Sequence, residues 1–167
     1  MSSQGKTQVN KNLDAKTIMV SRTFNAPIEA VWRAYTESEL LDQWWGPAPW
    51  RAETKYMDFK PGGYWLYSMV GPEGERHWAR MNFESIIPLK EFKGEDCFCD
   101  ENGNMDTSLP IMKWTNAFTK TEAGTLVVQT LFFTKLEDLQ KIVDMGFEEG
   151  MSLGLDQLEV LLSMQTA

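Results

Sequence analysis

The sequence predicts an α+β fold, in which a curved antiparallel sheet of about six or seven strands wraps around a long C-terminal helix. A helical pattern directly follows the first strand-like segment and divides into two short helices. A run of strand-like segments then fills the middle of the chain, and a long amphipathic stretch ends it. Strands grouped between helices are typical of helices packed against an antiparallel sheet, rather than of alternating parallel units.

The first part of the chain contains one strand followed by the two short helices. Apolar and polar residues alternate over residues 17–24, which is the pattern of a strand with one buried face. Asn25 then supplies a candidate N-cap, and Pro27 suits the first helical turn. Helical spacing of apolar residues follows over residues 28–35 and 37–44, and the glycine and prolines directly after the second pattern end it.

Strand-like segments fill the middle of the chain and are separated by turns rich in Gly, Pro, Asn and Asp. The clearest turn is Gly71-Pro72-Glu73-Gly74-Glu75, which predicts a hairpin. The expected strands are residues 52–59, 64–70, 77–87, 92–99, 113–121 and 125–134.

Two helices are expected at the end, over residues 136–145 and 147–164, with Gly146 as the break between them. Glycine recurs every fourth residue, at Gly146, Gly150 and Gly154. A glycine inside a helix costs about 1 kcal/mol relative to alanine. The repeat therefore indicates either a close backbone approach or space for a bound molecule. One apolar stripe follows the helix and is expected to pack on the sheet: Phe147, Met151, Leu155, Leu158 and Leu162.

Length and polarity indicate a single domain over residues 15–167, preceded by a flexible polar tail of residues 1–14. A 167-residue chain can bury roughly 70% of its unfolded surface without disulfides or metals. The N-terminal residues lack the apolar centre of a secretory signal. Cys97 and Cys99 stand two apart in one strand, so we expect free thiols in a reducing cytoplasm.

Charge and motif content exclude several classes of function. Twenty-four acidic residues against sixteen basic ones give a formal charge of −8, which argues against binding a nucleic-acid backbone. No stretch approaches the ~20 apolar residues of a membrane span. His77 is the only histidine, which argues against zinc and against a histidine relay. No phosphate-binding loop or dinucleotide fingerprint occurs, so no cofactor is expected.

Short motifs occur in one order along residues 15–165 and together resemble a known family. They are Phe24-Asn25-Ala26-Pro27 with Val31-Trp32, Trp44-Trp45-Gly46-Pro47, Pro61-Gly62-Gly63, Gly71-Pro72-Glu73-Gly74, Ile86-Ile87-Pro88, Asp100-Glu101-Asn102-Gly103-Asn104, Gly146, Glu148-Glu149-Gly150 and Leu155-Asp156-Gln157-Leu158. The set resembles the START-like (SRPBCC, helix-grip) superfamily. Within it, the set is similar to the family named after the C-terminal domain of the activator of the heat-shock protein 90 ATPase.

The resemblance implies an antiparallel sheet curled around the last helix, an architecture that usually encloses a cavity. It does not imply one reaction, because members bind lipids and hydrophobic metabolites, catalyse cyclase or hydrolase chemistry, or bind chaperones. The family pattern usually has Trp where this chain has Met151. The resemblance therefore implies a wider and softer space at this position.

The length of the Gly71–Glu75 loop decides which side chains of the hairpin face the cavity. A loop of two or four residues gives an aromatic wall with a charged floor, from the pairs Trp65/Asn82, Tyr67/Arg80 and Met69/Trp78. A loop of three residues would instead turn Ala79, Met81 and Phe83 inward and give a plain hydrophobic core. We favour the first register because its concave face would also hold Ile86.

The expected ligand site is aromatic, with Arg80 and Asn82 orienting a polar end of the ligand. Arg80 could anchor an anionic head group, with a helix carboxylate in its place when the site is empty, or extend along the wall to the rim. Seven Trp, nine Phe and ten Met are consistent with such a site and equally with an aromatic core. The candidate residues are Trp32, Tyr35, Trp45, Trp65, Tyr67, Trp78, Arg80, Asn82, Trp114, Phe118, Phe147, Met151 and Leu155.

Three functions remain open for a monomer or homodimer of this kind. The first is binding of a small hydrophobic or amphipathic molecule between the sheet and the last helix. The second is a chaperone-associated interaction domain, which requires an exposed contact surface and no cavity. The third is a cyclase- or hydrolase-like enzyme whose acid or base is Glu148, Glu149 or Asp156. A cavity of several hundred Å³ would favour the first or third, and a filled core with a large exposed apolar patch the second.

Overall fold

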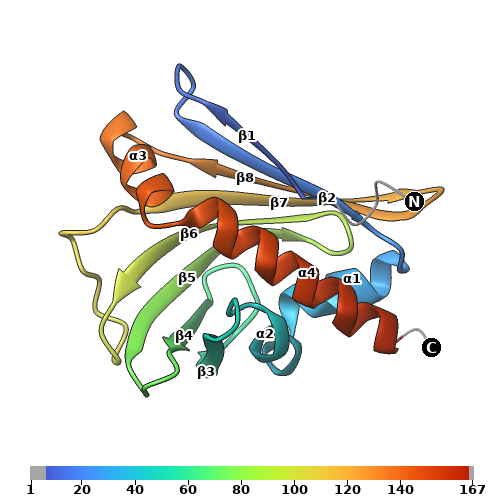
Figure 1. The fold of residues 1–167 in the computed structure, drawn as a ribbon, viewed down its shortest axis with the longest axis horizontal. Helices are drawn as coiled ribbons and strands as arrows, with labels where there is room; N and C mark the ends of the chain where they lie inside the picture. The colour runs from blue at the N-terminus through green and yellow to red at the C-terminus, as the bar shows by residue number, and fades with distance from the viewer. Residues whose placement is uncertain (1–6, 166–167) are drawn as a thin grey trace.

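The structure is a computed structural model that describes residues 7–165, and within this range it contains eight strands and four helices (Figure 1). The strands form one antiparallel sheet in the order β1-β2-β8-β7-β6-β5-β4-β3. They are β1 (Gln8–Asn12), β2 (Thr17–Phe24), β3 (Arg51–Met57), β4 (Tyr64–Val70), β5 (Arg76–Ile87), β6 (Glu91–Cys99), β7 (Met112–Thr121) and β8 (Gly124–Phe132). The helices are α1 (Ile28–Thr36), α2 (Ser38–Trp44), α3 (Leu136–Asp144) and α4 (Phe147–Gln165).

Helix α4 crosses one face of the sheet, and α1 and α2 lie on the same side (Figure 1). Its apolar stripe enters the common core, where Leu155, Leu158 and Leu162 are buried together with residues of the strands. The predicted α+β helix-grip fold is therefore confirmed, with eight strands in place of six or seven. No helix within residues 7–165 has both the length and the apolar character needed to cross a lipid bilayer.

The additional strand is β1, which lies in the N-terminal segment expected to be a tail. It pairs antiparallel with β2, from Gln8 opposite Ser21 to Asn12 opposite Thr17. Four of its five side chains are exposed, so its sequence has no apolar alternation by which a strand could be recognised. Residues 1–6 of the expected tail lie outside the described residues.

The ends of two helices test the expected capping residues. Helix α1 begins after Pro27, whose carbonyl accepts hydrogen bonds from the amides of Ala30 and Val31 at 3.0 and 3.1 Å. Asn25, the expected N-cap, lies two residues too early for that position. Gly146 separates α3 from α4 with a φ of +88°, a conformation that glycine adopts without strain, as expected for a break.

The β4–β5 hairpin has the register that the sequence analysis did not favour. Val70 pairs with Arg76, which leaves a loop of five residues closed by a hydrogen bond of 2.8 Å from the Gly71 amide to the Glu75 carbonyl. An odd number of loop residues shifts the pairing by one and turns every side chain of β5 to the other face. The inward side chains of β5 are consequently Ala79, Met81 and Phe83.

Candidate functional site

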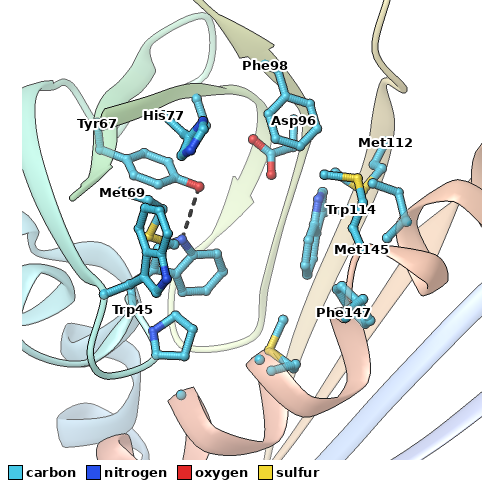
Figure 2. Close-up of a pocket in the computed structure, with 18 of the residues that line it drawn as sticks. Trp45, Tyr67, Met69, His77, Asp96, Phe98, Met112, Trp114, Met145 and Phe147 are labelled. Carbon is cyan, nitrogen blue, oxygen red and sulfur yellow. Dashed lines mark hydrogen bonds between the residues drawn. The ribbon is translucent and has the colours of Figure 1, made fainter. Parts of the chain in front are cut away.

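A pocket of about 420 Å³ lies between the sheet and the first half of α4 (Figure 2). The segment after α2 forms one wall, strands β4 to β7 form the floor, and α4 closes the opposite side. Side chains that define its shape are Trp45, Pro47, Trp50, Tyr67, Met69, His77, Asp96, Phe98, Met112, Trp114, Met145, Phe147 and Met151.

The wall after α2 is a rigid aromatic layer. Trp45 donates a hydrogen bond from Nε1 to the Tyr67 hydroxyl at 3.0 Å, and the Tyr67 ring stacks on Trp65 with centroids 4.0 Å apart. Trp114 lies 6.3 Å from Trp45 and 6.5 Å from Phe147, centroid to centroid, so aromatic rings border the space on three sides. Aromatic walls of this kind suit a flat or apolar molecule.

Gln157 of α4 holds this wall in place. Its Nε2 donates to the carbonyls of Trp44 and Gly46 at 3.0 and 2.8 Å, and its Oε1 accepts from the Ala48 amide at 2.8 Å. A single side chain thus satisfies three backbone groups of the segment that carries Trp45. The helix and the aromatic wall are therefore fixed relative to each other.

Asp96 of β6 provides the one carboxyl group that lines the pocket among the described residues. Its side chain is only 6% exposed, and its Oδ1 has no hydrogen-bond partner within residues 7–165. Burial raises the pKa of Asp96 to about 7, although the Cys97 amide and the Trp114 indole N–H oppose that rise. The indole faces the carboxyl (Figure 2) but does not meet it in hydrogen-bond geometry, so Nε1 also lacks a partner within the described chain.

Tyr67 adds a second donor to the polar end of the pocket. Its hydroxyl oxygen accepts the bond from Trp45, which leaves its O–H free to donate. Burial, together with the negative charge of Asp96, raises the pKa of Tyr67 well above its usual range, so the hydroxyl keeps its proton. The carboxyl of Asp96 can thus act as an acceptor in a mainly apolar pocket, and Trp114 Nε1 and the Tyr67 hydroxyl as donors.

His77 and Trp50 line the pocket side by side. His77 is exposed and packs against Trp50, with ring centroids 5.4 Å apart. The register favoured from the sequence would turn His77 to the outer face of the sheet, whereas in the observed register His77 pairs with Met69 and lines the pocket. Within residues 7–165, no lysine or arginine lines the pocket and no cluster of three metal-ligating side chains occurs.

Five of the candidate residues line the pocket: Trp45, Tyr67, Trp114, Phe147 and Met151. Another five belong to the core beside it. Trp32 packs edge-on against Phe118 at 5.1 Å, and Leu155 is fully enclosed. Tyr35 and Trp65 border a separate space of about 10 Å³, which is near the size of one water molecule.

Trp78, Arg80 and Asn82 lie on the opposite face of the sheet from the pocket, which corrects the register-based expectation. Arg80 donates from Nε to Asn82 Oδ1 at 2.7 Å, and its guanidinium lies 3.8 Å from the centre of the Tyr64 ring. Because side chains alternate between the faces of a strand, Arg80 cannot anchor a head group inside this pocket.

The arginine that is paired with helix carboxylates is Arg22 of β2. Its side chain is buried and donates to Asp156 Oδ1 at 2.6 Å and Glu159 Oε1 at 3.0 Å, both on α4. Asp156 is thereby engaged in an ion pair away from the pocket. Glu148 likewise pairs with Lys11 at 2.8 Å, so these two candidate acids stand outside the pocket.

Asp96 was not predicted as a site residue, although the sequence contains a signal for it. Phe92, Asp96 and Phe98 have the same parity in one strand, so they share a face. An acidic residue between phenylalanines on the core side of a strand is rarely fully buried without a partner. This alternation is a better indicator of the site than the hairpin register was.

The fold and the pocket define the class of this protein as START-like, with an antiparallel sheet, a C-terminal helix across it and a cavity between them. The chain belongs to the family described as "Activator of Hsp90 ATPase homolog 1-like protein", whose sequence pattern matches residues 25–163. The predicted family is thus confirmed. No curated protein matches the chain.

Solved structures of bacterial proteins share this architecture. Protein Ms6760 from Mycobacterium smegmatis is 31% identical, with 94% of this chain and 97% of that chain covered and a TM-score of 0.87. A protein from Arthrobacter aurescens is 29% identical over 94% of this chain and 91% of its own, with a TM-score of 0.88. A protein from Staphylococcus epidermidis is 30% identical over 95% and 94%, with a TM-score of 0.83.

Proposed function

We propose that the protein binds a small hydrophobic or amphipathic molecule in the pocket between the sheet and α4. The observation that carries this proposal is a pocket of about 420 Å³ with aromatic walls and one buried, unpartnered carboxyl among the described residues. Protein interiors are close-packed and rarely leave spaces of this size without use. The proposed setting is the cytoplasm, supported by the free thiols of Cys97 and Cys99.

The interaction-domain alternative has one observation in its favour. Leu153, Val160 and Met164 lie seven and four residues apart on α4 and are exposed, so they share one apolar side of the helix. The family name suggests a chaperone as the partner of such a surface. The pocket weighs against this alternative as the main function, because an interaction domain does not need an internal space.

Native mass spectrometry of the freshly purified protein tests the proposal, with Met151→Trp as the key variant. Met151 lines the pocket, and an indole at this position would occupy part of the space that a ligand needs. We expect the wild-type protein to carry a small molecule that leaves on denaturation, and the variant to lack it. Met164→Trp is the matched control, because Met164 is on the same helix but 65% exposed.

The spectra also separate the alternatives. An equal ligand content in the wild type and Met151→Trp would contradict binding in this pocket. A wild-type protein free of any small molecule, together with a chaperone that binds the α4 surface, would support the interaction domain instead. The same spectra report whether the protein is a monomer or a homodimer.

A further inference from the structure

We propose that the ligand is an uncharged molecule with a hydroxyl or amide at one end, which Asp96, Trp114 and Tyr67 bind at the buried end of the pocket. This inference rests on the proposed function and specifies the chemical class of ligand. It follows from two buried polar atoms without a hydrogen-bond partner in the described chain, Asp96 Oδ1 and Trp114 Nε1, and from the O–H of Tyr67, which is free to donate.

The three groups are buried and line one pocket. Asp96, Trp114 and Tyr67 are each at least nine-tenths buried, and all three line the same space. Their polar atoms converge on the interior from strands β6, β7 and β4 (Figure 2). A buried polar group without a hydrogen bond destabilises a protein. A ligand that supplies the missing partners would therefore gain affinity at this point.

The polarity of these atoms selects the ligand group. Above its pKa of about 7 the Asp96 carboxyl is ionised, and Oδ1 can then only accept. Trp114 Nε1 can only donate, and the Tyr67 O–H is free to donate because the hydroxyl oxygen accepts from Trp45. The complementary group must both donate and accept. A hydroxyl and a primary or secondary amide meet this requirement, whereas an ether or a ketone can only accept.

Charged ligands fit the pocket less well. A carboxylate or phosphate would face Asp96 in a pocket that, within residues 7–165, contains no lysine or arginine. An ammonium group could pair with Asp96 but has no acceptor for the donors of Trp114 and Tyr67. If the uncharged end of the ligand binds here, its apolar remainder can pack against the apolar lining of the pocket, including Phe147 and Met151.

Titration calorimetry at about pH 8, where the Asp96 carboxyl is mostly ionised, tests this inference with four probes of one shape. The probes are 2-naphthylmethanol, 2-naphthylmethylamine, 2-naphthoate and 2-methylnaphthalene. They share the ring system and differ only at the group that would reach Asp96. We expect 2-naphthylmethanol to bind at least about tenfold more tightly than each of the other three, because only it can both donate and accept at that point without a charge.

Three variants connect that preference to the proposed residues. Asp96→Leu and Trp114→Phe should each reduce the affinity for the alcohol about tenfold or more and leave 2-methylnaphthalene nearly unchanged. Asp96→Asn keeps the size of the side chain and provides both a donor and an acceptor, so the affinity for 2-naphthylmethanol should be retained. This variant also covers the case in which Asp96→Leu fails to fold. Arg80→Gln is the matched control, since Arg80 is polar and on the other face of the same sheet.

The possible results distinguish a wrong ligand class from a wrong function. Tighter binding of the amine or the carboxylate would overturn the inference and leave ligand binding in the pocket intact. Equal affinities for 2-methylnaphthalene and 2-naphthylmethanol would also overturn the inference about the ligand class and leave ligand binding in the pocket intact. Failure of all four probes to bind, with Met151→Trp indistinguishable from the wild type, would overturn the proposed function itself.

Discussion

At the scale of single residues, Asp96 is a carboxyl group in surroundings very different from water. Its carboxyl is buried on the apolar face of β6, and this burial raises the pKa from 3.8 to about 7. The folded protein therefore retains a proton on Asp96 at pH values where the unfolded chain has released it. Asp96 thus couples the state of the pocket to pH near neutrality.

The contribution of Asp96 to the free energy of unfolding should fall as pH rises from about 4 to about 7, because unfolding releases the Asp96 proton in this interval, and should level off above it. At about 1.4 kcal/mol per pKa unit, the effect is roughly 2–4 kcal/mol. Asp96→Asn should lose this dependence and be more stable than the wild type at about pH 8. Urea unfolding at a series of pH values measures the difference between the two.

The control for this prediction is Glu95→Gln, which removes a neighbouring carboxyl from the same strand and keeps Asp96, so the loss of stability between about pH 4 and about pH 7 that is due to Asp96 should persist. A constant difference between Asp96→Asn and the wild type from about pH 5 to about pH 8 would show that the carboxyl is ionised throughout. In that case the pocket would carry a negative charge at its buried end.

At the scale of secondary structure elements, the hydrogen bonds of Gln157 are the connection between α4 and the wall that carries Trp45. Gln157→Leu keeps the size of the side chain and leaves three backbone groups without their partner. We expect a loss of roughly 1–3 kcal/mol in the free energy of unfolding. The affinity for a pocket ligand should also fall, because Trp45 loses its fixed position.

Gln140→Leu is the matched control, because Gln140 is exposed on α3 and makes a single side-chain bond, to Asp144, in the described chain. Thermal unfolding and titration with 2-naphthylmethanol measure the two effects separately. If Gln157→Leu lowers stability but leaves the affinity unchanged, Gln157 supports the fold without positioning the pocket wall.

The glycines of α4 give a second prediction at this scale. A Cβ on Gly150 would lie 3.7 Å from Pro47 Cγ, which is ordinary van der Waals contact. Gly150→Ala should therefore stabilise the protein by up to about 1 kcal/mol through helix propensity. Gly146→Ala should instead destabilise it by about 1 kcal/mol, because Gly146 has a φ of +88°.

Thermal unfolding of the two variants distinguishes these roles of glycine. Gly150 also lines the pocket, so titration with 2-naphthylmethanol should accompany the stability measurement. A more stable Gly150→Ala with a lower affinity would show that Gly150 provides space for the ligand. A less stable Gly150→Ala would mean that the helix approaches Pro47 too closely for a methyl group.

At the scale of the whole molecule, the periodic patterns of apolar residues predicted most of the fold. They did not predict strand β1 or the register of the β4–β5 hairpin. Alternation in β2 and the stripe on α4 are properties of side chains that face one core, so the sequence alone reveals them. The exposed strand β1 has no such pattern. The hairpin register depended on a five-residue loop, and the wrong parity placed Arg80 on the wrong face.

The candidate site was predictable where it coincides with the core. Trp45, Tyr67 and Trp114 were expected because large aromatic residues line or fill the interior of such a fold. Asp96 was not expected, because its role depends on the groups that surround it in space rather than on its sequence neighbours. Pairing of Arg22 with α4 was missed for the same reason, since 134 residues separate Arg22 from Asp156.

The pairing of Arg22 holds the final helix against the sheet and gives a prediction for the whole molecule. Asp156→Asn with Glu159→Gln would leave a buried guanidinium without its carboxylates, and we expect a loss of roughly 1–3 kcal/mol in the free energy of unfolding. The effect is below that of a fully buried pair because both carboxylates are partly exposed.

Arg22→Met should be closer to neutral, since it removes the buried charge together with its need for partners. Urea unfolding of the double variant, Arg22→Met and the triple variant completes the comparison. If Arg22→Met were the most destabilised of the three, the arginine would stabilise the fold in its own right.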